Sequence, residues 1–399
     1  MKVAVVVGRR FFRQDGAWYT VGAAGSEAGA HYLDAFETVI VCGRAGQRPK
    51  GGTAAVTRLD PRIQVVLLPD VATRLAQLTG EWQLRAALRS VFADVDAVIV
   101  RLGLSSFAAS ALARQMGKPL ACVIGARAYD SLTAYGTLAG RVYAPLAEWR
   151  ARRAVRRCDY VSFVTQNYLQ ACYPIRPGTV TFAGSNVDIP TPQAAVLERR
   201  LARIATPRDT LVFGTVGNLA GRLKGIHLAL EALSQQSDSL PPWRYRILGG
   251  GDSSWLRRRA ETLGVSDRVH FDGTRPSGDP VLDWLDDIDV LLHPSLREGL
   301  PRAVIEAMSR GCPVIATSVA GTPELLPPDD LVPTNDIDAL SAVLPVTPSP
   351  EWQADRARRN WTQAHRYDRE RLRGLRLEFW QSFSNFAQTR SKPTRTPEV

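Results

Sequence analysis

Two glutamates eight residues apart, Glu298 and Glu306, have the clearest capacity for chemistry in this sequence. A carboxylate accepts hydrogen bonds from adjacent hydroxyl groups, such as those of a ribose, and stabilises positive charge developing at a sugar carbon. Pro301 suits the first turn of a helix, and Gly311 suits its C-terminal cap. The sequence therefore predicts a helix from about Pro301 to Arg310. Glu298 would then lie in the loop before the helix, and Glu306 would lie inside it.

The predicted loop follows the apolar run Val290–His293, which indicates a buried strand. In open α/β folds, ligands bind beyond the carboxyl ends of the parallel strands. The free N–H groups of Arg302, Ala303 and Val304 would point toward an anion there, and the helix dipole would favour it. Taken alone, the two glutamates have an alternative interpretation as solvated side chains near a helix.

A second segment, Gly217–Gly225, also follows a predicted strand and contains Asn218, Arg222 and Lys224. Glycines let a backbone approach its ligand closely. The two cations suit a diphosphate, whose leaving oxygen gains negative charge as the bond to it breaks. Only five of the 50 basic residues are lysines, which favours a specific role for Lys224. The alternative is that Arg222 and Lys224 belong to a solvated turn.

A second glycine cluster, Gly249–Gly251, ends the next predicted strand and could also cradle a ligand or simply allow close packing of a helix on a sheet. Neither glycine cluster has the G-x-G-x-x-G spacing of a dinucleotide fingerprint, and none follows the first strand at Val3–Val7. The sequence therefore argues against an NAD-dependent enzyme.

The elements that position these segments are short apolar, β-branched runs alternating with helical patterns, which is typical of parallel sheets covered by helices. Two series of strands predict two doubly wound domains. The first series is Val3–Val7, Thr38–Cys42, Ile63–Leu68, Ala97–Arg101, Leu120–Ile124, Tyr160–Val164 and Thr179–Phe182. The second series is Thr210–Val216, Tyr245–Leu248, Val269–Phe271, Val290–His293 and Pro313–Thr317.

The junction between the domains is predicted within Ser185–Arg208, where Pro190 and Pro192 punctuate the chain. We expect an N-terminal domain over residues 1–190 and a C-terminal domain over residues 205–365. Residues 389–399 are predicted to be a disordered tail.

Composition narrows the class of protein. Of the 399 residues, 45% are hydrophobic and 22% charged, and no 18-residue apolar run lacks charge, so we expect no spanning helix. The five cysteines form no C-x-x-C pair, which argues against a zinc site and for a reducing compartment such as the cytoplasm. The net charge of +11 favours phosphorylated ligands or anionic lipid. Nucleic acid ranks below these because no nucleic-acid-binding motif accompanies the charge.

Together the motifs of the C-terminal half resemble the retaining GT-B glycosyltransferases of family 4, the group 1 glycosyl transferases. The resemblance covers roughly Leu211–Leu344 and depends on the order and spacing of the motifs. These are Gly217 to Gly225, Leu248 to Gly251, Val269 to Gly273, Pro294-Ser295, the Glu298–Glu306 pair and Val319 to Glu324. The fold it implies is α/β, with two Rossmann-like doubly wound domains facing across a cleft. A C-terminal helix at about residues 368–388 would pack back on the N-terminal domain.

The resemblance also implies roles for residues. Lys224 would bind the donor diphosphate together with backbone N–H groups of the 302–304 turn, and Glu306 would hold the ribose. Glu298, with the backbone of Gly299 and Leu300, would hold the transferred sugar. The remaining donor contacts would come from Gly217, Asn218, Arg222, Gly273, Thr274 and, from the N-terminal domain, Gly16. The implied reaction retains anomeric configuration and needs no metal or other cofactor.

Two positions depart from the pattern of many relatives. Asn218 stands where they carry an arginine, and Arg222 is a candidate to supply that charge instead. No histidine follows the strand Leu120–Ile124, where relatives have one. Asp130, just downstream, is a substitute candidate for contacting the sugar or the acceptor, although a loop or capping aspartate is an equally good interpretation. His293 is interpreted as a structural strand residue.

The N-terminal domain would bind the acceptor. The stretch Arg141–Arg157 carries six arginines against Glu148, with Val142, Leu146, Trp149 and Val155 as apolar partners. A basic amphipathic helix of this kind could lie on an anionic membrane surface, or it could be an ordinary solvated helix.

The expected function is sugar transfer from a nucleotide-diphosphate sugar to a glycan or lipid-linked acceptor, in cell-surface polysaccharide or glycolipid synthesis. The location would be the cytoplasm or the inner face of the membrane. Another GT-B enzyme, such as a nucleotide-sugar epimerase or a glucan synthase, is an alternative. So is an inactive sugar-nucleotide-binding protein.

Overall fold

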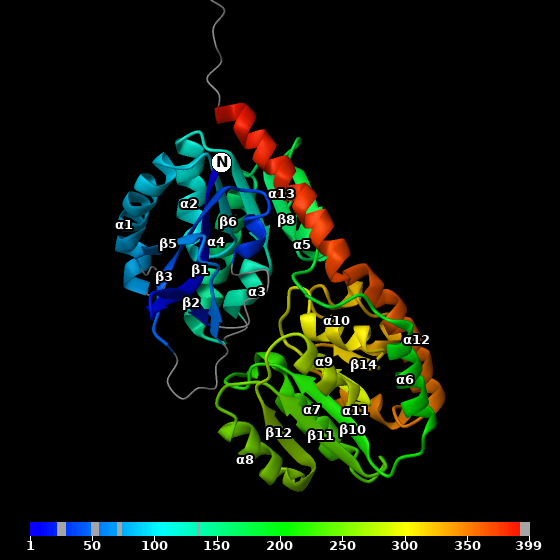
Figure 1. Ribbon diagram of the computed structural model, residues 1–399. Helices are drawn as coiled ribbons and strands as arrows, with labels where there is room; N and C mark the ends of the chain where they lie inside the picture. Colours follow the sequence, from blue (N-terminus) through cyan, green and yellow to red (C-terminus); the bar gives the residue numbers. More distant parts are fainter. Residues whose placement is uncertain (22–28, 49–55, 70–73, 134–135, 392–399) are drawn as a thin grey trace, which may run out of the picture. The chain divides into compact units, whose positions relative to one another are not determined.

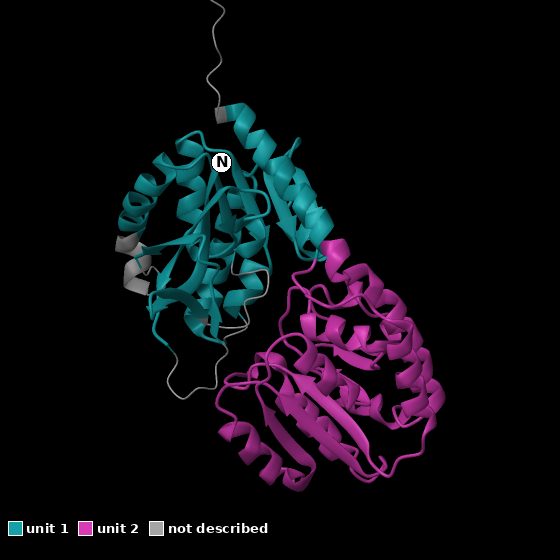
Figure 2. Ribbon diagram, in the orientation of Figure 1, with its two compact units in different colours: residues 1–50, 56–184, 373–399 teal, residues 51–55, 185–372 magenta. Residues whose placement is uncertain are grey.

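The computed structural model describes residues 1–21, 29–48, 56–69, 74–133 and 136–391. The chain divides into two compact units, coloured separately in Figure 2. Unit 1 contains residues 1–50, 56–184 and 373–399, and unit 2 contains residues 51–55 and 185–372. The main division at residue 185 falls where the predicted junction begins. Residues 392–399, most of the predicted disordered tail, lie outside the described residues.

Unit 1 is built on a nine-stranded sheet among its described residues, with helices packed against it (Figure 1). The strand path is β4-β2-β1-β6-β7-β8-β9. In addition, β3 pairs with β1, and β5 pairs with β3. The strands are β1 Lys2–Gln14, β2 Ala17–Val21, β3 Thr38–Ala45, β4 Val56–Arg58, β5 Ile63–Leu68, β6 Ala97–Arg101, β7 Leu120–Ile124, β8 Tyr160–Phe163 and β9 Val180–Ala183. The helices are α1 Arg74–Ala93, α2 Leu104–Gln115, α3 Ala128–Thr133, α4 Leu138–Val155 and α5 Tyr168–Cys172, with a short 3₁₀ turn at Ala30–Tyr32.

The helix α13 (Arg369–Ser391) ends the described chain and supplies aromatic side chains to the core of unit 1. Phe379, Trp380 and Phe383 are buried in the same cluster as Val3 and Ile99 of the sheet. Tyr160 of β8 lies against Phe379 and Phe383, with ring centroids 5.5 and 5.1 Å away. The predicted C-terminal helix at about residues 368–388 corresponds to α13.

The first strand differs from its sequence prediction. It was expected to end at Val7, but β1 continues to Gln14 and returns as β2, which pairs with it antiparallel. Asp15 and Gly16 form the turn with φ of 48° and 75°. An Asp-Gly pair with positive φ is the usual two-residue hairpin turn. Arg9 and Arg10 interrupt the apolar run, so a prediction from hydrophobicity alone placed the end of the strand too early.

Unit 2 has a six-stranded, all-parallel sheet in the order β12-β11-β10-β13-β14-β15. Its strands are β10 Leu211–Val216, β11 Trp243–Leu248, β12 Val269–Gly273, β13 Val290–His293, β14 Val314–Thr317 and β15 Leu331–Val332. Its helices are α6 Ala194–Ala205, α7 Ile226–Gln235, α8 Ser254–Thr262, α9 Asp279–Asp286, α10 Arg302–Ser309, α11 Ile337–Ala342 and α12 Pro350–Ala364. The short strands β2, β4 and β15 were not predicted.

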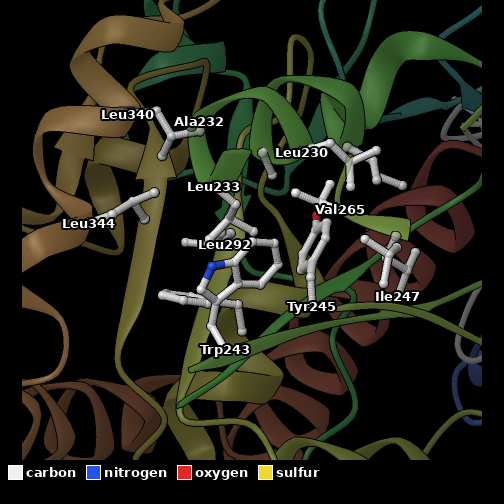
Figure 3. Close-up of a cluster of buried hydrophobic side chains, with 14 of the residues drawn as sticks. Leu230, Ala232, Leu233, Trp243, Tyr245, Ile247, Val265, Leu292, Leu340 and Leu344 are labelled. Carbon is white, nitrogen blue, oxygen red and sulfur yellow. The ribbon is translucent and has the colours of Figure 1, made fainter. Parts of the chain in front are cut away.

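The core on one face of this sheet is shown in Figure 3. Trp243 and Tyr245 of β11 lie beneath Leu230 and Leu233 of α7 within one buried cluster. Tyr245 also shares a 2.7 Å hydrogen bond with the hydroxyl of Thr215 on β10. Burying aromatic and branched side chains in this way fixes α7 on the sheet. That contact positions the glycine-rich loop between β10 and α7.

Among the described residues, no helix combines the length and the apolar character needed to cross a membrane.

Candidate active site

The candidate site lies at the carboxyl edge of the sheet of unit 2. From β10, the strand order runs through β11 and β12 on one side and through β13, β14 and β15 on the other. Where the strand order changes direction in this way, a crevice opens between the loops that follow the two central strands, β10 and β13, and open α/β sheets bind their ligands there. The loop Gly217–Gly225 follows β10, and the loop Pro294–Pro301 follows β13. These are the two segments that the sequence singled out.

Direct contacts hold the two loops together. The backbone N–H of Leu296 donates to the carbonyl of Leu223 over 2.8 Å. The buried hydroxyl of Ser295 donates to the same carbonyl over 3.1 Å. Gly225 has φ of 63°, and a Cβ there would lie 1.8 Å from the carbonyl oxygen of Pro294. Only glycine allows this approach, so the sequence fixes the distance between the two loops.

Lys224 and Glu298 meet where the loops join. The Nζ atom of Lys224 donates to Oε1 of Glu298 over 2.6 Å. The Nε2 atom of His293, the last residue of β13, lies 2.9 Å from the same oxygen. The side chains of Glu298 and His293 are only 10% and 2% exposed. Within the described part of the chain, the other carboxylate oxygen, Oε2, has no hydrogen-bond partner, so it is available to a ligand.

The charge state of Glu298 follows from these contacts. Burial alone would raise the pKa of this carboxyl, but the charge of Lys224 and the hydrogen bond from His293 outweigh it. They hold the pKa of Glu298 well below its ordinary value of 4.5. Glu298 is therefore an anion at any physiological pH. Since an anion only accepts hydrogen bonds, Nε2 of His293 carries the proton that they share.

The helix α10 begins at Arg302, one residue after Pro301, and ends before Gly311, whose φ is 59°. Both ends agree with the prediction from the two punctuating residues. The N–H groups of Arg302, Ala303 and Val304 have no carbonyl four residues earlier in the helix to bond. They therefore leave a partial positive charge at the mouth of the loop.

Glu306 lies inside α10 and differs from Glu298 in its environment. It is half-buried, and its carboxylate makes no hydrogen bond to any described residue. Burial raises the pKa of Glu306, and nearby Asp188 adds to this effect against the opposing charge of Arg302. An acceptor group without a donor is costly when buried, so this site favours a ligand that brings hydroxyl donors.

The glycine loop after β10 is shaped around Lys224. A Cβ on Gly217 would lie 2.7 Å from Cγ of Lys224, so the absence of a side chain lets the lysine stem lie against the loop. Asn218 does not replace the missing arginine, because its Oδ1 accepts the backbone N–H of Ala220 over 2.8 Å and closes a local turn. Its role is thus to shape the backbone.

Arg222 is exposed and stacks on a side chain that sequence reasoning missed. Its guanidinium lies 5.6 Å from the ring centroid of Trp255, the second residue of α8. The indole Nε1 of Trp255 donates to the carbonyl of Leu219 in the same loop over 2.8 Å. Trp255 therefore supports the loop and orients Arg222 at its rim.

Neighbouring strand ends join the same edge through backbone hydrogen bonds. Gly249 donates to Gly273 over 2.7 Å, which brings the end of β11 against the end of β12. Gly321 donates to Gly299 over 2.9 Å, which ties the segment after β14 to the loop after β13. Thr274 follows Gly273 and is exposed. The predicted residues of unit 2 thus lie along one continuous edge.

Two predicted residues, Gly16 and Asp130, lie in unit 1. Gly16 forms the β1–β2 hairpin turn. Asp130 is in the first turn of α3, and its Oδ2 accepts the hydroxyl of Tyr168 over 2.7 Å. Arg127 lies 3.7 Å from its other oxygen. The donor contact of Gly16 and the sugar or acceptor contact of Asp130 stay predictions.

His293 and Trp255 are the site residues that the sequence did not identify. His293 had a usable signal, because it stands at the end of a strand directly before the Pro294 loop. Trp255 had none, since its contact with the loop after β10 depends on how α8 packs.

Comparison with known proteins agrees with this geometry. Residues 210–344 match the family model described as Glycosyl transferases group 1. Over 150 residues, the chain is 39% identical to WcaL of Escherichia coli (strain K12), named as a colanic acid biosynthesis glycosyltransferase. The match covers 35% of this chain and 36% of that protein, little more than a third of each. Residues 210–344 are thus a group 1 glycosyl transferase domain, as the resemblance predicted.

Solved structures resemble the chain along nearly its whole length. Sucrose-phosphate synthase from Thermosynechococcus elongatus has a TM-score of 0.70 at 18% identity, covering 97% of this chain and 99% of that one. HepE of Anabaena, solved in complex with UDP-glucose, has a TM-score of 0.65 at 16% identity, covering 96% of this chain and all of that one. The fold is therefore the α/β fold of GT-B glycosyltransferases, with two Rossmann-like units, which confirms the predicted fold class.

Proposed function

We propose that this protein is a retaining hexosyltransferase. It moves a sugar from a nucleotide-diphosphate sugar to a glycan or lipid-linked acceptor during the synthesis of cell-surface polysaccharide or glycolipid. The observation that carries the proposal is the buried contact of Lys224 and His293 with one oxygen of Glu298. It places Lys224, a cation that can bind phosphate, beside Glu298, an anion that can bind the sugar. Both lie between the loops that follow the central strands β10 and β13.

The donor diphosphate takes its counter-charge from the protein. Lys224 supplies a point charge, Arg222 a second cation at the rim, and the first turn of α10 free N–H groups. When the diphosphate binds, it competes with Glu298 for Lys224. These groups supply positive charge without a resident metal, and the proposed reaction uses none.

The sugar and the nucleoside are held by the acidic pair. Glu306, whose carboxylate has no donor among the described residues, accepts the two hydroxyls of the ribose. Oε2 of Glu298 accepts sugar hydroxyls, with the backbone of Gly299 and Leu300 beside it. The end of β12 at Gly273 and Thr274 approaches the base. HepE has been solved with UDP-glucose, which supports a nucleotide sugar of this kind as the donor.

The reaction breaks the bond between the anomeric carbon and the diphosphate oxygen and forms a bond from that carbon to the acceptor oxygen on the same face. The acceptor proton passes to the departing diphosphate. Glu298, kept ionised by its two partners, stabilises positive charge at the anomeric carbon, and Lys224 stabilises the leaving group. The other contacts position the two substrates.

The acceptor side belongs to unit 1, and Asp130 is its candidate sugar contact. WcaL is named for colanic acid biosynthesis, which supports a surface polysaccharide as the product. The five free thiols and the use of a nucleotide sugar suit the cytoplasm, at the inner face of the membrane.

A panel of nucleotide sugars tests the proposal. The wild-type protein should release nucleoside diphosphate from at least one donor. Mass spectrometry should find the sugar either free, after transfer to water, or attached to an added glycan. An epimerase would return an isomerised sugar instead, and a glucan synthase would extend only a glucan. An inactive binding protein, the alternative favoured by Asn218, would gain thermal stability from the nucleotide while consuming no donor. Any of these three results would reject the proposal.

A further inference from the structure

The outward face of α4 exposes large apolar side chains. Leu138, Val142, Leu146 and Trp149 are 80%, 73%, 49% and 55% exposed. Their spacing of four, four and three residues places them in one stripe along the helix. Single exposed apolar residues are ordinary on protein surfaces, but a contiguous stripe marks an interaction site.

None of the four side chains is among the buried core residues of the part of unit 1 that the structure describes. The inward face of α4 is made of small side chains, among them the buried Ala147, Ala151 and Ala154. Val155 is buried with them, so it does not share a face with Val142, Leu146 and Trp149 as the sequence suggested. The helix therefore has two apolar faces, and only the inward one has a partner among the described residues.

Arginines continue the outward stripe. Arg141, Arg153 and Arg156 are exposed on the same face, and Arg153 lies 5.5 Å from the ring centroid of Trp149. The one acid of the helix, Glu148, is turned inward, where it accepts from the hydroxyl of Tyr173 over 3.1 Å. The exposed stripe thus has apolar side chains along its length, with Arg141 near its N-terminal end and Arg153 and Arg156 at its C-terminal end.

The positive charge extends beyond the stripe. Burial lowers the pKa of Arg157, and the like charges of Arg153 and of Arg85 on α1 lower it further. Arg150 of α4 pairs with Glu81 of α1 over 2.9 Å, which holds the two helices together. The guanidinium groups of Arg157, Arg153 and Arg85 are therefore close enough to interact, and an anionic surface would favour such a group of cations.

We infer that this face of α4 docks on an anionic lipid bilayer. Leu138, Val142, Leu146 and Trp149 insert at the level of the headgroups, and Arg141, Arg153 and Arg156 contact lipid phosphates. A helix with an exposed apolar stripe beside arginines is the form that lies in the plane of a membrane interface. The inference does not depend on sugar transfer.

Flotation of the full-length protein with phospholipid vesicles tests it. The wild type should float with vesicles of phosphatidylcholine mixed with phosphatidylglycerol, less with phosphatidylcholine alone, and less at high salt. The arginine variant R141Q/R153Q/R156Q should bind the anionic vesicles roughly a hundredfold more weakly. The apolar variant L138Q/V142Q/L146Q should also lose binding, since no charge has changed but the insertion is gone.

A matched control has the same change of charge elsewhere. Arg199, Arg244 and Arg258 are exposed in unit 2, and R199Q/R244Q/R258Q should float like the wild type. Melting temperatures of all variants should match the wild type, because each change is at an exposed position. If a triple variant fails to fold, the single changes V142Q and R156Q are measured instead.

Three outcomes would overturn the inference. The first is a wild type that does not bind anionic vesicles, and the second is a set of stripe variants that float as well as the control. Sedimentation showing a dimer that the apolar variant abolishes, with no vesicle binding, would assign the stripe to a second copy of the chain.

Discussion

Replacing Lys224 with methionine tests the central contact of the site, because methionine keeps the length of the stem and removes the charge. Glu298 would then be a buried anion supported only by His293. Removing one partner of a buried pair costs about 3–5 kcal/mol. The side chain of Lys224 is 29% exposed, so solvent screens part of this, and we expect a loss of about 2 kcal/mol.

The double variant K224M/E298Q removes both charges and should recover most of that loss, to within about 1 kcal/mol of the wild type. The pH dependence has a definite sign. Because the pKa of folded Glu298 is depressed, the pair stabilises the fold fully above the unfolded value of 4.5 and loses this effect as the pH falls through the folded value. The gap between K224M and the wild type should therefore be largest at neutral pH and should narrow in acid.

Thermal unfolding of the full chain measures both effects. A loss of about 2 kcal/mol lowers the Tm by roughly 4–8 °C for a unit of this size. The comparison among wild type, K224M, E298Q and the double variant forms a double-mutant cycle. A Tm of K224M equal to that of the wild type at neutral pH, or a double variant no more stable than K224M, would refute the reasoning.

Three further predictions concern single side chains. Glu306→Gln should weaken nucleoside diphosphate binding by about tenfold or more. Without nucleotide, the same change should raise the Tm at neutral pH but not below about pH 4, because the raised pKa of Glu306 makes its ionisation costly only above the unfolded pKa. A lower Tm of the variant at neutral pH would contradict this. His293→Phe should reduce kcat by about 10–100-fold with little change in the KM for the nucleotide sugar, while His293→Gln, which keeps a hydrogen-bond donor, should restore part of the lost kcat. Activity of both variants equal to that of the wild type would exclude a positioning role. Trp255→Phe should raise donor KM several-fold through the lost bond to Leu219, as should Arg222→Gln; an unchanged KM in both would remove Trp255 and Arg222 from the phosphate site.

The sequence was most informative where local rules decide the structure. The helix α10 begins and ends where Pro301 and Gly311 predicted, because both residues act through their own backbone geometry. The buried strands β6, β7 and β13 have the predicted bounds, since continuous apolar runs in a parallel sheet have few alternatives. The half-exposed strand β5 also has its predicted bounds.

What the sequence missed depends on contacts between distant segments. The continuation of β1 to Gln14 is stabilised by its pairing with β2, which outweighs the polar residues in between. The stacking of Arg222 on Trp255 requires the packing of α8 beside the glycine loop. Glu298 is hydrogen-bonded by both Lys224, which is 74 positions away in the sequence, and His293, which is five positions away. Only the fold brings the three side chains together.

The most direct test of the donor site compares the wild type and Glu298→Gln in the release of nucleoside diphosphate from a panel of nucleotide sugars. The wild type should turn over at least one donor. Glu298→Gln should do so about 100-fold more slowly while binding the bare nucleotide at least as tightly, since Glu298 acts on the sugar and competes with the diphosphate for Lys224. Equal turnover by the two proteins would contradict the assignment of Glu298, and with it the proposed site.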